Sequence, residues 1–533
     1  MATLSPNQLA QLRARMLQRS EAGTPVWPVA VRPCAELNAL ALLMGHLLGR
    51  LPNDDVAPLC RPILSEQLAD GSWNHDVSAT LEIVQALSQT QRPEVRPALN
   101  KAVAWLEEHP RKRRLRAETL LLLGFTTGLG APLRYRSLVK PVLHAALDWN
   151  LRHEAPTRKL AAHVLLNEPG ADRARTAKLV RTQLADGSWE GDVRATALAL
   201  AALRQAGLPA SDAIFERGYR FMRVLQQWDG NDLIQSGCDI STMLHAVTLR
   251  SLLLAGGESQ ELAGSALVLL QQQDQSGGWS VGSGQSVDVI TTAQALDALA
   301  LFGDDPLDTR WARRRAAEFL LSVQQADGSW AVLPKPMAWL RRGLRAPGSL
   351  DATSLALLAL TECGESFAIR GMQRGAQYIR AKQMANGSFA ASSLKSRIGS
   401  TMLAAEALDA FGGQRALVER ALDWIAAQQH ALGGFGETEG LTSWHTALAI
   451  RGMSLRPARY AEPLATARAH LLLRQDDQLK IWVDPAPTLF LPGGTARQDV
   501  HELSTLAALE AMNIGSRVRA SRNRMQRAKL SRG

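Results

Sequence analysis

QLADGSW at residues 67–73 is the most informative stretch of the sequence, because it returns unchanged at 183–189 and in related forms further along the chain. The copies share a Gln, a Gly four residues later and an aromatic residue two positions after the Gly. The clear copies are Gln67/Gly71/Trp73, Gln183/Gly187/Trp189, Gln273/Gly277/Trp279, Gln324/Gly328/Trp330, Gln383/Gly387/Phe389 and Gln429/Gly433/Phe435. Recurrence of this kind indicates a repeat protein.

Each copy lies between two Ala- and Leu-rich segments of helical length, which predicts a helix–turn–helix unit. The Gly permits a positive φ angle and ends the first helix. We expect the Gln amide to bind free backbone groups at the turn and the aromatic ring to pack against the neighbouring unit. Two further copies are incomplete: Gln226/Gly230 is followed by Asp232 in place of the aromatic residue, and Gln475 precedes Leu479 in place of the Gly.

The helices after the turns share an opening Asp with a Thr four residues later, as in Asp76/Thr80, Asp192/Thr196 and Asp288/Thr292. An Asp in this place is a good N-cap and suits the positive end of the helix dipole. Helices of this kind are predicted to begin near Glu36, Asp76, Leu115, Thr157, Asp192, Asp239, Asp288, Asp351, Ser400, Ser443 and Asp499. Two rings of hairpins would use nearly all of them, so we expect an all-α double toroid; an open solenoid is the geometric alternative.

Composition and charge restrict the function classes. Apolar residues make up 46% and charged residues 21% of the 533, which is typical of a folded chain with a large core. The net charge of +10 favours an anionic partner, namely nucleic acid, anionic lipid or a phosphorylated substrate. Nucleic-acid binding would require basic residues on successive repeats, whereas the turns carry Asp70, Asp186 and Asp327, so we expect no nucleic acid.

The four cysteines are far apart and form no Cys-x-x-Cys pair, so we expect neither a disulfide framework nor a zinc cluster, and a reducing cytoplasm fits. No run of eighteen apolar residues occurs, and the first thirty residues do not resemble a signal peptide. A spanning helix is therefore not expected, while peripheral membrane contact stays open.

The turns are similar to the QW repeats of the squalene cyclase and prenyltransferase superfamily, whose members form α-toroids around an apolar cavity. The layout resembles that of bacterial class II diterpene cyclases of the copalyl diphosphate synthase type, in which a γ toroid is inserted into a β toroid. This resemblance implies N-terminal helices of the β toroid at 1–54, a γ insertion at 55–257, the rest of the β toroid at 258–515 and a basic tail at 516–533.

The family starts its reaction with an Asp-x-Asp-Asp-Thr-Ala motif, whose middle Asp donates a proton. Here the corresponding slot reads DVITTA at 288–293, so Asp288 matches but Ile290 stands at the acid position. Aligning Thr353 with the motif threonine puts Asp351 in the acid register one hairpin later. Both Asp288 and Asp351 are candidate acids, and an N-cap is the alternative for each; a toroid without any proton donor is the third possibility.

A connection with alternating basic and apolar residues follows Trp330. It contains the candidate substrate-binding residues Lys335, Trp339, Arg341, Arg342 and Arg345. The pattern suits a diphosphate held by guanidinium groups at the cavity mouth, or a short helix in a membrane interface. A solvated loop is the alternative.

Metal ligands are few. Glu437 and Glu439 could help to hold Mg²⁺ with a diphosphate, although acidic turns are common. The zinc site of protein prenyltransferases needs an Asp-x-Cys, which neither Cys238 nor Cys363 provides, so we expect no protein-bound zinc.

Three functions are in competition. The resemblance implies a class II terpene cyclase-like enzyme that protonates and cyclises a linear isoprenoid, preferably an isoprenyl diphosphate. The second is a non-catalytic toroid that binds isoprenoids or lipids and has lost the acid. The third, a solenoid that binds nucleic acid or protein, has only the basic charge and the hairpins in its favour.

Overall fold

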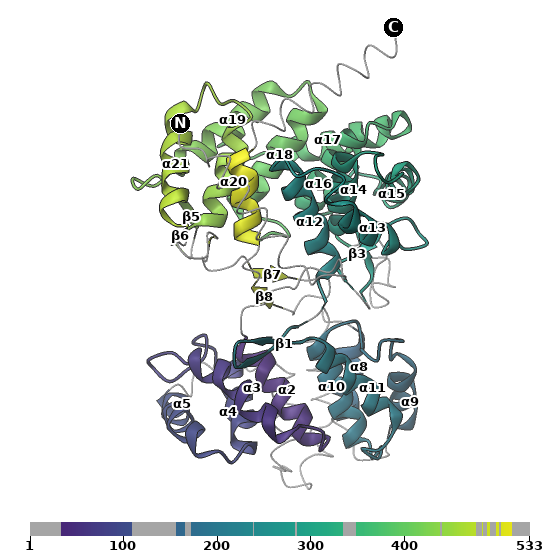
Figure 1. Ribbon diagram of the computed structural model, residues 1–533, viewed down its shortest axis with the longest axis vertical. Helices are drawn as coiled ribbons and strands as arrows, with labels where there is room; N and C mark the ends of the chain where they lie inside the picture. Colours follow the sequence, from purple (N-terminus) through teal and green to yellow (C-terminus); the bar gives the residue numbers. More distant parts are fainter. Residues whose placement is uncertain are drawn as a thin grey trace.

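Helix pairs make up nearly all of the computed structural model, which describes residues 34–108, 156–165, 172–237, 239–282, 285–333, 348–437, 440–475, 482, 488–490, 497–499 and 503–513. Figure 1 shows these helices in two groups, one above the other in the view. Two separate hydrophobic cores match the two groups: one contains residues from Ala35 to Leu233 and the other residues from Ala246 to Met512. We call these groups the first and the second toroid.

The first toroid has inner helices that follow the turns and outer helices that precede them. Its elements are α2 (Ala35–Leu47), α3 (Asn53–Ser65), α4 (Val77–Gln89), η1 (Pro93–Val95), α5 (Arg96–Glu108), α8 (Pro156–Leu165), α9 (Arg173–Arg181), α10 (Val193–Gln205), α11 (Ala213–Val224), β1 (Gln226–Asp229) and β2 (Asp232–Gln235). Inner helix α2 packs against α4 and α10, and α10 packs against α8. The incomplete copy at Gln226 forms the antiparallel β1–β2 hairpin rather than a helix–helix turn.

The second toroid repeats this plan with more hairpins. Its helices are α12 (Ser241–Leu254), α13 (Ala263–Gln271), α14 (Val289–Phe302), α15 (Arg310–Ser322), α16 (Leu350–Cys363), η3 (Ser366–Ala368), α17 (Ile369–Ala381), α18 (Arg397–Phe411), α19 (Arg415–Ala427), α20 (Ser443–Met453), α21 (Ala461–Leu473) and a helix at 503–513. Its antiparallel strand pairs are β3 (Trp279–Ser280) with β4 (Val287–Asp288), β5 (Phe435–Glu437) with β6 (Gly440–Thr442), and β7 (Thr488–Phe490) with β8 (Arg497–Asp499).

The inner helices of the second toroid form a closed ring. Each of α12, α14, α16, α18 and α20 packs against the next. The ring closes because Ser251 on α12 donates a hydrogen bond to Glu510 of the last helix at 2.8 Å. An open solenoid would leave these two helices at opposite ends, so the toroid prediction is confirmed for this half of the chain.

The turns use the predicted chemistry. Gln273 Nε2 donates to the carbonyl oxygens of Gly277 (2.8 Å) and Ala312 (2.9 Å), so one amide joins its own turn to the following outer helix. The same pair of bonds recurs from Gln67, Gln183, Gln324, Gln383 and Gln429. Gly277 has φ +94°, and a Cβ there would lie 2.5 Å from the carbonyl oxygen of Arg315, so only Gly fits.

A threonine on each inner helix fixes how that helix sits on the preceding turn. The backbone N–H of Trp279 donates to Thr292 Oγ1 at 2.9 Å, and that of Trp330 donates to Thr353 Oγ1 at the same distance. Equivalent bonds join Trp73 to Thr80, Trp189 to Thr196, Phe389 to Thr401, Phe435 to Thr446 and Trp482 to Thr505. Residues at equal spacing from these threonines are therefore structurally equivalent.

Two helices lie on the other side of the expected domain junctions. Helix α2, expected to open the β toroid, packs in the first toroid, because buried Asn38 bonds to the carbonyls of Leu59 (3.2 Å) and Leu233 (2.8 Å). Helix α12, expected to end the γ insertion, packs against α14 in the second. Among the described residues, the change of core falls between Leu233 and Ala246. The tail at 516–533 lies outside them.

Candidate active site

The threonine register defines one layer of positions at the N-terminal ends of the inner helices of the second toroid. Two residues before each threonine stand Ile290, Asp351, Gly399, Trp444 and Leu503. We call these five residues the acid layer, because Ile290 occupies the acid position of the motif. Because Thr353 and Thr292 bind their turns in the same way, Asp351 is the structural equivalent of Ile290.

Asp288 caps α14. Its Oδ1 accepts a hydrogen bond from the backbone N–H of Thr291 at 2.7 Å, as the N-cap alternative requires. The side chain is also almost completely buried, and Oδ2 has no hydrogen-bond partner in the described part of the chain. Burial raises the pKa of Asp288 to about 7, against the opposing effect of the bonds from Thr291. Near neutral pH a large share of this carboxyl therefore carries a proton.

Asp351 is not an N-cap. Ser349 caps α16 instead, since its Oγ accepts from the backbone N–H of Ala352 at 3.2 Å. Asp351 lies in the first turn, is fully buried, and accepts through Oδ2 from the backbone N–H of Leu394 at 2.8 Å. Within the described ranges its Oδ1 has no hydrogen-bond partner. Burial raises the pKa of Asp351, and the bond from Leu394 opposes this rise. The N-cap alternative for Asp351 is wrong.

Several inner-helix side chains at and below the acid layer are partly exposed. On α14 only Ile290 and Gln294 are partly exposed in the first two turns, and Leu355 is the corresponding residue on α16. Trp444 on α20 adds an aromatic ring to the acid layer and is likewise partly exposed. If the centre of the ring were filled, the neighbouring inner helices would bury these residues. Their exposed surface therefore lies inside the ring.

The centre of the first toroid differs. Arg194 occupies the acid-register position there, two residues before Thr196, and donates to Glu82 (2.9 Å) and Glu36 (2.7 Å). These three side chains tie α2, α4 and α10 together across the ring. On α10 the first toroid therefore has a cation, rather than an acid, in this register.

Glu437 is engaged in structure. Its Oε1 accepts from the backbone N–H of Ile398 (2.8 Å) and from Ser396 Oγ (3.0 Å), at the N-terminus of α18, and it lies 4.0 Å from His445 Nε2. Glu439 is outside the described residues. Among the residues that the structure describes, no group of three metal-ligating side chains is found. The suggested Mg²⁺ site stays a prediction.

The basic connection leads into α16, the helix that carries Asp351. Lys335, Trp339, Arg341, Arg342 and Arg345 lie outside the described residues. The two ends of the connection are paired, because the N–H of Ser349 donates to the carbonyl of Trp330 at 2.8 Å. In the described ranges, no helix is both long and apolar enough to cross a membrane.

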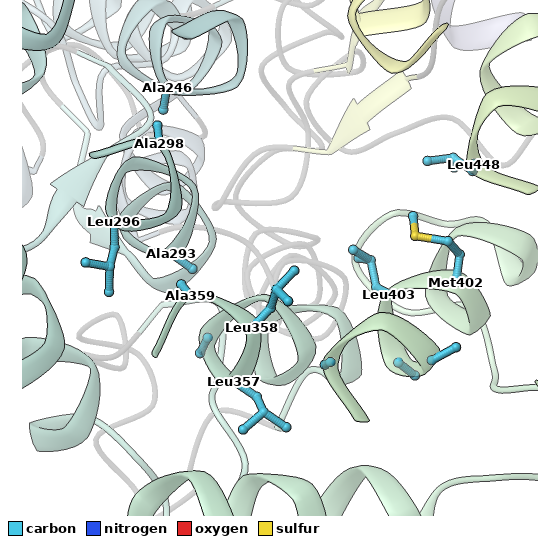
Figure 2. Packing of buried hydrophobic residues seen from close by; sticks show 14 of the residues in the cluster. Ala246, Ala293, Leu296, Ala298, Leu357, Leu358, Ala359, Met402, Leu403 and Leu448 are labelled. Carbon is cyan, nitrogen blue, oxygen red and sulfur yellow. The ribbon is translucent and has the colours of Figure 1, made fainter. Parts of the chain in front are cut away.

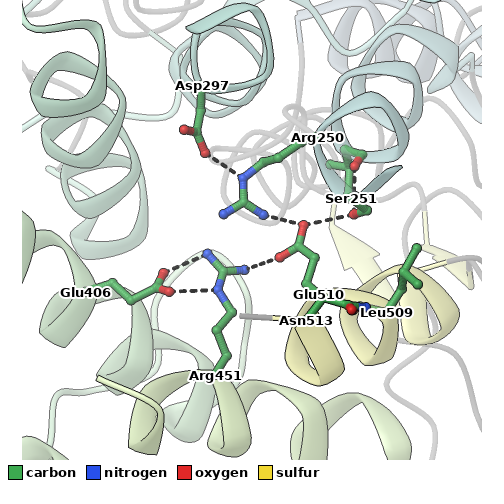
Figure 3. A network of polar contacts seen from close by, with 9 residues as sticks. Arg250, Ser251, Asp297, Glu406, Arg451, Leu509, Glu510 and Asn513 are labelled. Carbon is green, nitrogen blue, oxygen red and sulfur yellow. Dashed lines mark hydrogen bonds and ion pairs between the residues drawn. The ribbon is translucent and has the colours of Figure 1, made fainter. Parts of the chain in front are cut away.

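A buried network of five charged side chains was not found by sequence reasoning (Figure 3). It consists of Arg250, Asp297, Glu406, Arg451 and Glu510, which we call the ion layer. Each lies on a different inner helix. The sequence did contain a pattern that could have revealed this network: four of the five residues stand seven positions after an acid-layer residue.

Comparisons with known proteins agree with this geometry. Residues 243–439 match the family model of the prenyltransferase alpha-alpha toroid domain. The chain is similar to the solved structure of ent-copalyl diphosphate synthase from Streptomyces platensis, with 19% identity and a TM-score of 0.66 over 96% of this chain and 99% of that chain. No curated protein sequence matches it.

Two other solved structures are similar at lower TM-scores. Abietadiene synthase from Abies grandis is 15% identical, with a TM-score of 0.47 over 96% of this chain and 58% of that chain. A structure of type II terpene cyclase MstE from Scytonema in complex with geranylgeranyl dihydroxybenzoate is 15% identical, with a TM-score of 0.42 over 68% of this chain and 99% of that chain.

The domain match and the first of these structures confirm two predictions. The fold is an all-α double toroid, and residues 243–439 belong to the part that matches the prenyltransferase alpha-alpha toroid domain. The solved structure that it resembles over nearly its whole length is that of an ent-copalyl diphosphate synthase, the type of protein that the sequence resemblance implied.

Proposed function

We propose that the protein is a class II terpene cyclase-like enzyme that cyclises a linear isoprenoid, with Asp351 as the proton donor. The observation that carries the proposal is a fully buried carboxyl in the acid register with one oxygen free of hydrogen bonds in the described part of the chain. Burial raises the pKa of Asp351 and so favours the protonated form, which is the state a proton donor needs.

The reaction would run as an isomerisation. The Asp351 carboxyl gives its proton to a carbon–carbon double bond of the bound chain, so that a C–H bond forms, a tertiary cation results and a carboxylate remains. The next double bond attacks the cation and closes a ring, and a proton finally leaves carbon to water or a base. Trp444 would present its ring face to cationic intermediates, and the apolar walls would exclude water from them.

Asp288 is the second candidate donor. It lies on the neighbouring inner helix and has a free oxygen and a raised pKa, but its other oxygen caps α14. We therefore assign it the role of a buried acid that supports Asp351 or replaces it weakly.

The substrate would be an isoprenyl diphosphate. Lys335, Arg341, Arg342 and Arg345 would bind its phosphates with Trp339 beside them, and Mg²⁺ would accompany the diphosphate. This assignment is supported by the net charge of +10 and by the paired ends of the connection at Trp330 and Ser349. We place the enzyme in the cytoplasm, in isoprenoid biosynthesis, with peripheral contact at the inner membrane face and no nucleic acid as partner.

The test is turnover with geranylgeranyl diphosphate, farnesyl diphosphate and squalene, followed by mass spectrometry of the products. We expect a new compound of unchanged mass from one of the three. Replacing Asp351 by Asn should lower its rate at least about 100-fold, the usual contribution of a general acid. The matched control is Asp186→Asn, at an outer turn of the first toroid, which should keep the wild-type rate. Unchanged substrate in all three incubations rejects the proposal.

A non-catalytic isoprenoid-binding toroid is the second candidate. Ile290 at the usual acid position and the capping role of Asp288 favour it. It predicts that isoprenoids copurify with the protein without conversion, and that Asp351→Asn leaves the amount bound unchanged.

A further inference from the structure

The ion layer is one connected chain of hydrogen-bonded ion pairs. Arg250 Nε donates to Asp297 at 2.5 Å, and Arg250 also pairs with Glu510. Arg451 donates to both oxygens of Glu406 (2.8 and 2.6 Å) and to Glu510 (2.8 Å). Two guanidinium groups are thus joined through one shared carboxylate, as Figure 3 shows.

This layer crosses the ring at one depth. Asp297, Glu406, Arg451 and Glu510 each follow an acid-layer residue by seven positions, which is about two helical turns. Of the six inner helices, only α16 contributes no charged residue to this layer; it has Leu358 at the same spacing from Asp351. All residues at this depth except Arg451 are at most 6% exposed, so the ring is filled here.

One turn above, the ring is lined by five apolar side chains and one glutamine. This middle layer consists of Val247, Gln294, Leu355, Leu403, Leu448 and Ala507, of which all but the two leucines Leu403 and Leu448 are partly exposed. Figure 2 shows Leu358, Leu403 and Leu448 pointing toward the middle of the ring. The lumen is therefore accessible in the middle layer and closed at the ion layer.

We infer that the ion layer and Leu358 form the floor of a blind apolar pocket, and that this floor sets the length of isoprenoid chain that the protein accepts. Seven residues of helix span roughly 10 Å, which is the depth available below Asp351. A hydrocarbon end cannot displace the ion layer, because it would have to separate buried charges from their partners without replacing those contacts. Leu358 is the one apolar, truncatable side chain in the floor. The inference rests on the isoprenoid ligand of the proposed function, but not on catalysis.

The test measures equilibrium binding of geraniol, farnesol, geranylgeraniol and geranylfarnesol by calorimetry. Two variants change the pocket: Leu358→Ala deepens the floor, and Leu355→Trp fills the middle layer. Leu357→Ala is the matched control, since Leu357 is buried on the same helix but points away from the middle of the ring in Figure 2. Thermal unfolding verifies that each variant is folded.

In the wild type we expect affinity to rise with chain length and to fall beyond one optimum. Leu358→Ala should improve binding of the next longer alcohol, relative to the wild-type optimum, about tenfold, because roughly two more methylene groups are buried. Leu355→Trp should move the optimum to a shorter alcohol, and Leu357→Ala should keep the wild-type order. The inference is overturned if no alcohol binds or if both pocket variants keep the wild-type order. Loss of turnover with normal binding would reject only the proposed reaction.

Discussion

Arg250 and Glu510 form a buried ion pair although they are 260 residues apart in the sequence. Arg250 belongs to the first inner helix of the second toroid and Glu510 to the last, so the pair joins the two ends of the ring. Burial works against the charge of Glu510, but Arg250 and Arg451 outweigh it and hold the pKa of Glu510 below its usual range. Ring closure is thus an electrostatic contact as well as a hydrophobic one.

Replacing Arg250 by Met should destabilise the second toroid by about 3 to 5 kcal/mol, because Asp297 and Glu510 would keep buried charges without their shared cation. The free energy of unfolding, measured by urea denaturation, tests this expectation. Arg314→Met is the control: Arg314 pairs with Glu318 on the exposed face of α15, and its loss should leave the stability close to the wild-type value. Equal effects of the two variants would contradict the assigned role of the pair.

Replacing Gln273 by Ala should cost about 2 to 3 kcal/mol, because the carbonyls of Gly277 and Ala312 would both lose a donor. Gln273→Glu should be as harmful, since a carboxylate has the same shape but no N–H to donate. The neighbouring Gln272 is exposed, and Gln272→Ala should leave the urea midpoint unchanged. If Gln273→Glu were as stable as the wild type, the amide bonds would not be what holds the turn.

Most of the fold could be predicted because its determinants are local. The Gln, Gly and aromatic residue of each turn lie within seven residues of one another, so their joint chemistry is visible in the sequence. The domain junctions could not be predicted in the same way. Helix α2 looks like any other inner helix, and its place depends on bonds such as that from Asn38 to Leu233, 195 residues away.

The candidate site was predicted only in part. The threonine register assigns Asp351 to the acid layer, but sequence could not tell whether Asp351 or Ser349 caps α16, because both residue types are good caps. The ion layer was missed for a different reason. Its members lie on helices far apart in the chain, and only ring closure brings them together.

Gly277→Ala should be much more harmful than Gly364→Ala, although both glycines have positive φ angles, +94° and +75°. At Gly364 nothing lies within 4 Å of a new Cβ, so we expect only the backbone cost of about 1 kcal/mol. At Gly277 the Cβ would also clash with the carbonyl of Arg315, which should bring the total to about 3 to 4 kcal/mol. Urea denaturation distinguishes the two, and similar midpoints would show that the turn can move away from α15.

Asp288→Asn should make the protein more stable at high pH and leave it unchanged at low pH. Burial raises the pKa of Asp288 to about 7 in the folded state, from 3.8 when unperturbed. The folded state therefore binds more protons than the unfolded state between these values, and the wild type loses stability as the pH rises from about 4 to about 7. Asn keeps the cap on α14 but does not ionise, so this loss should be absent. Above pH 7 the variant should be more stable by on the order of 4 kcal/mol, and urea midpoints across the pH range measure the difference. If the urea midpoints of the two proteins changed with pH in the same way, Asp288 would be ionised in the folded state and could not act as a proton donor.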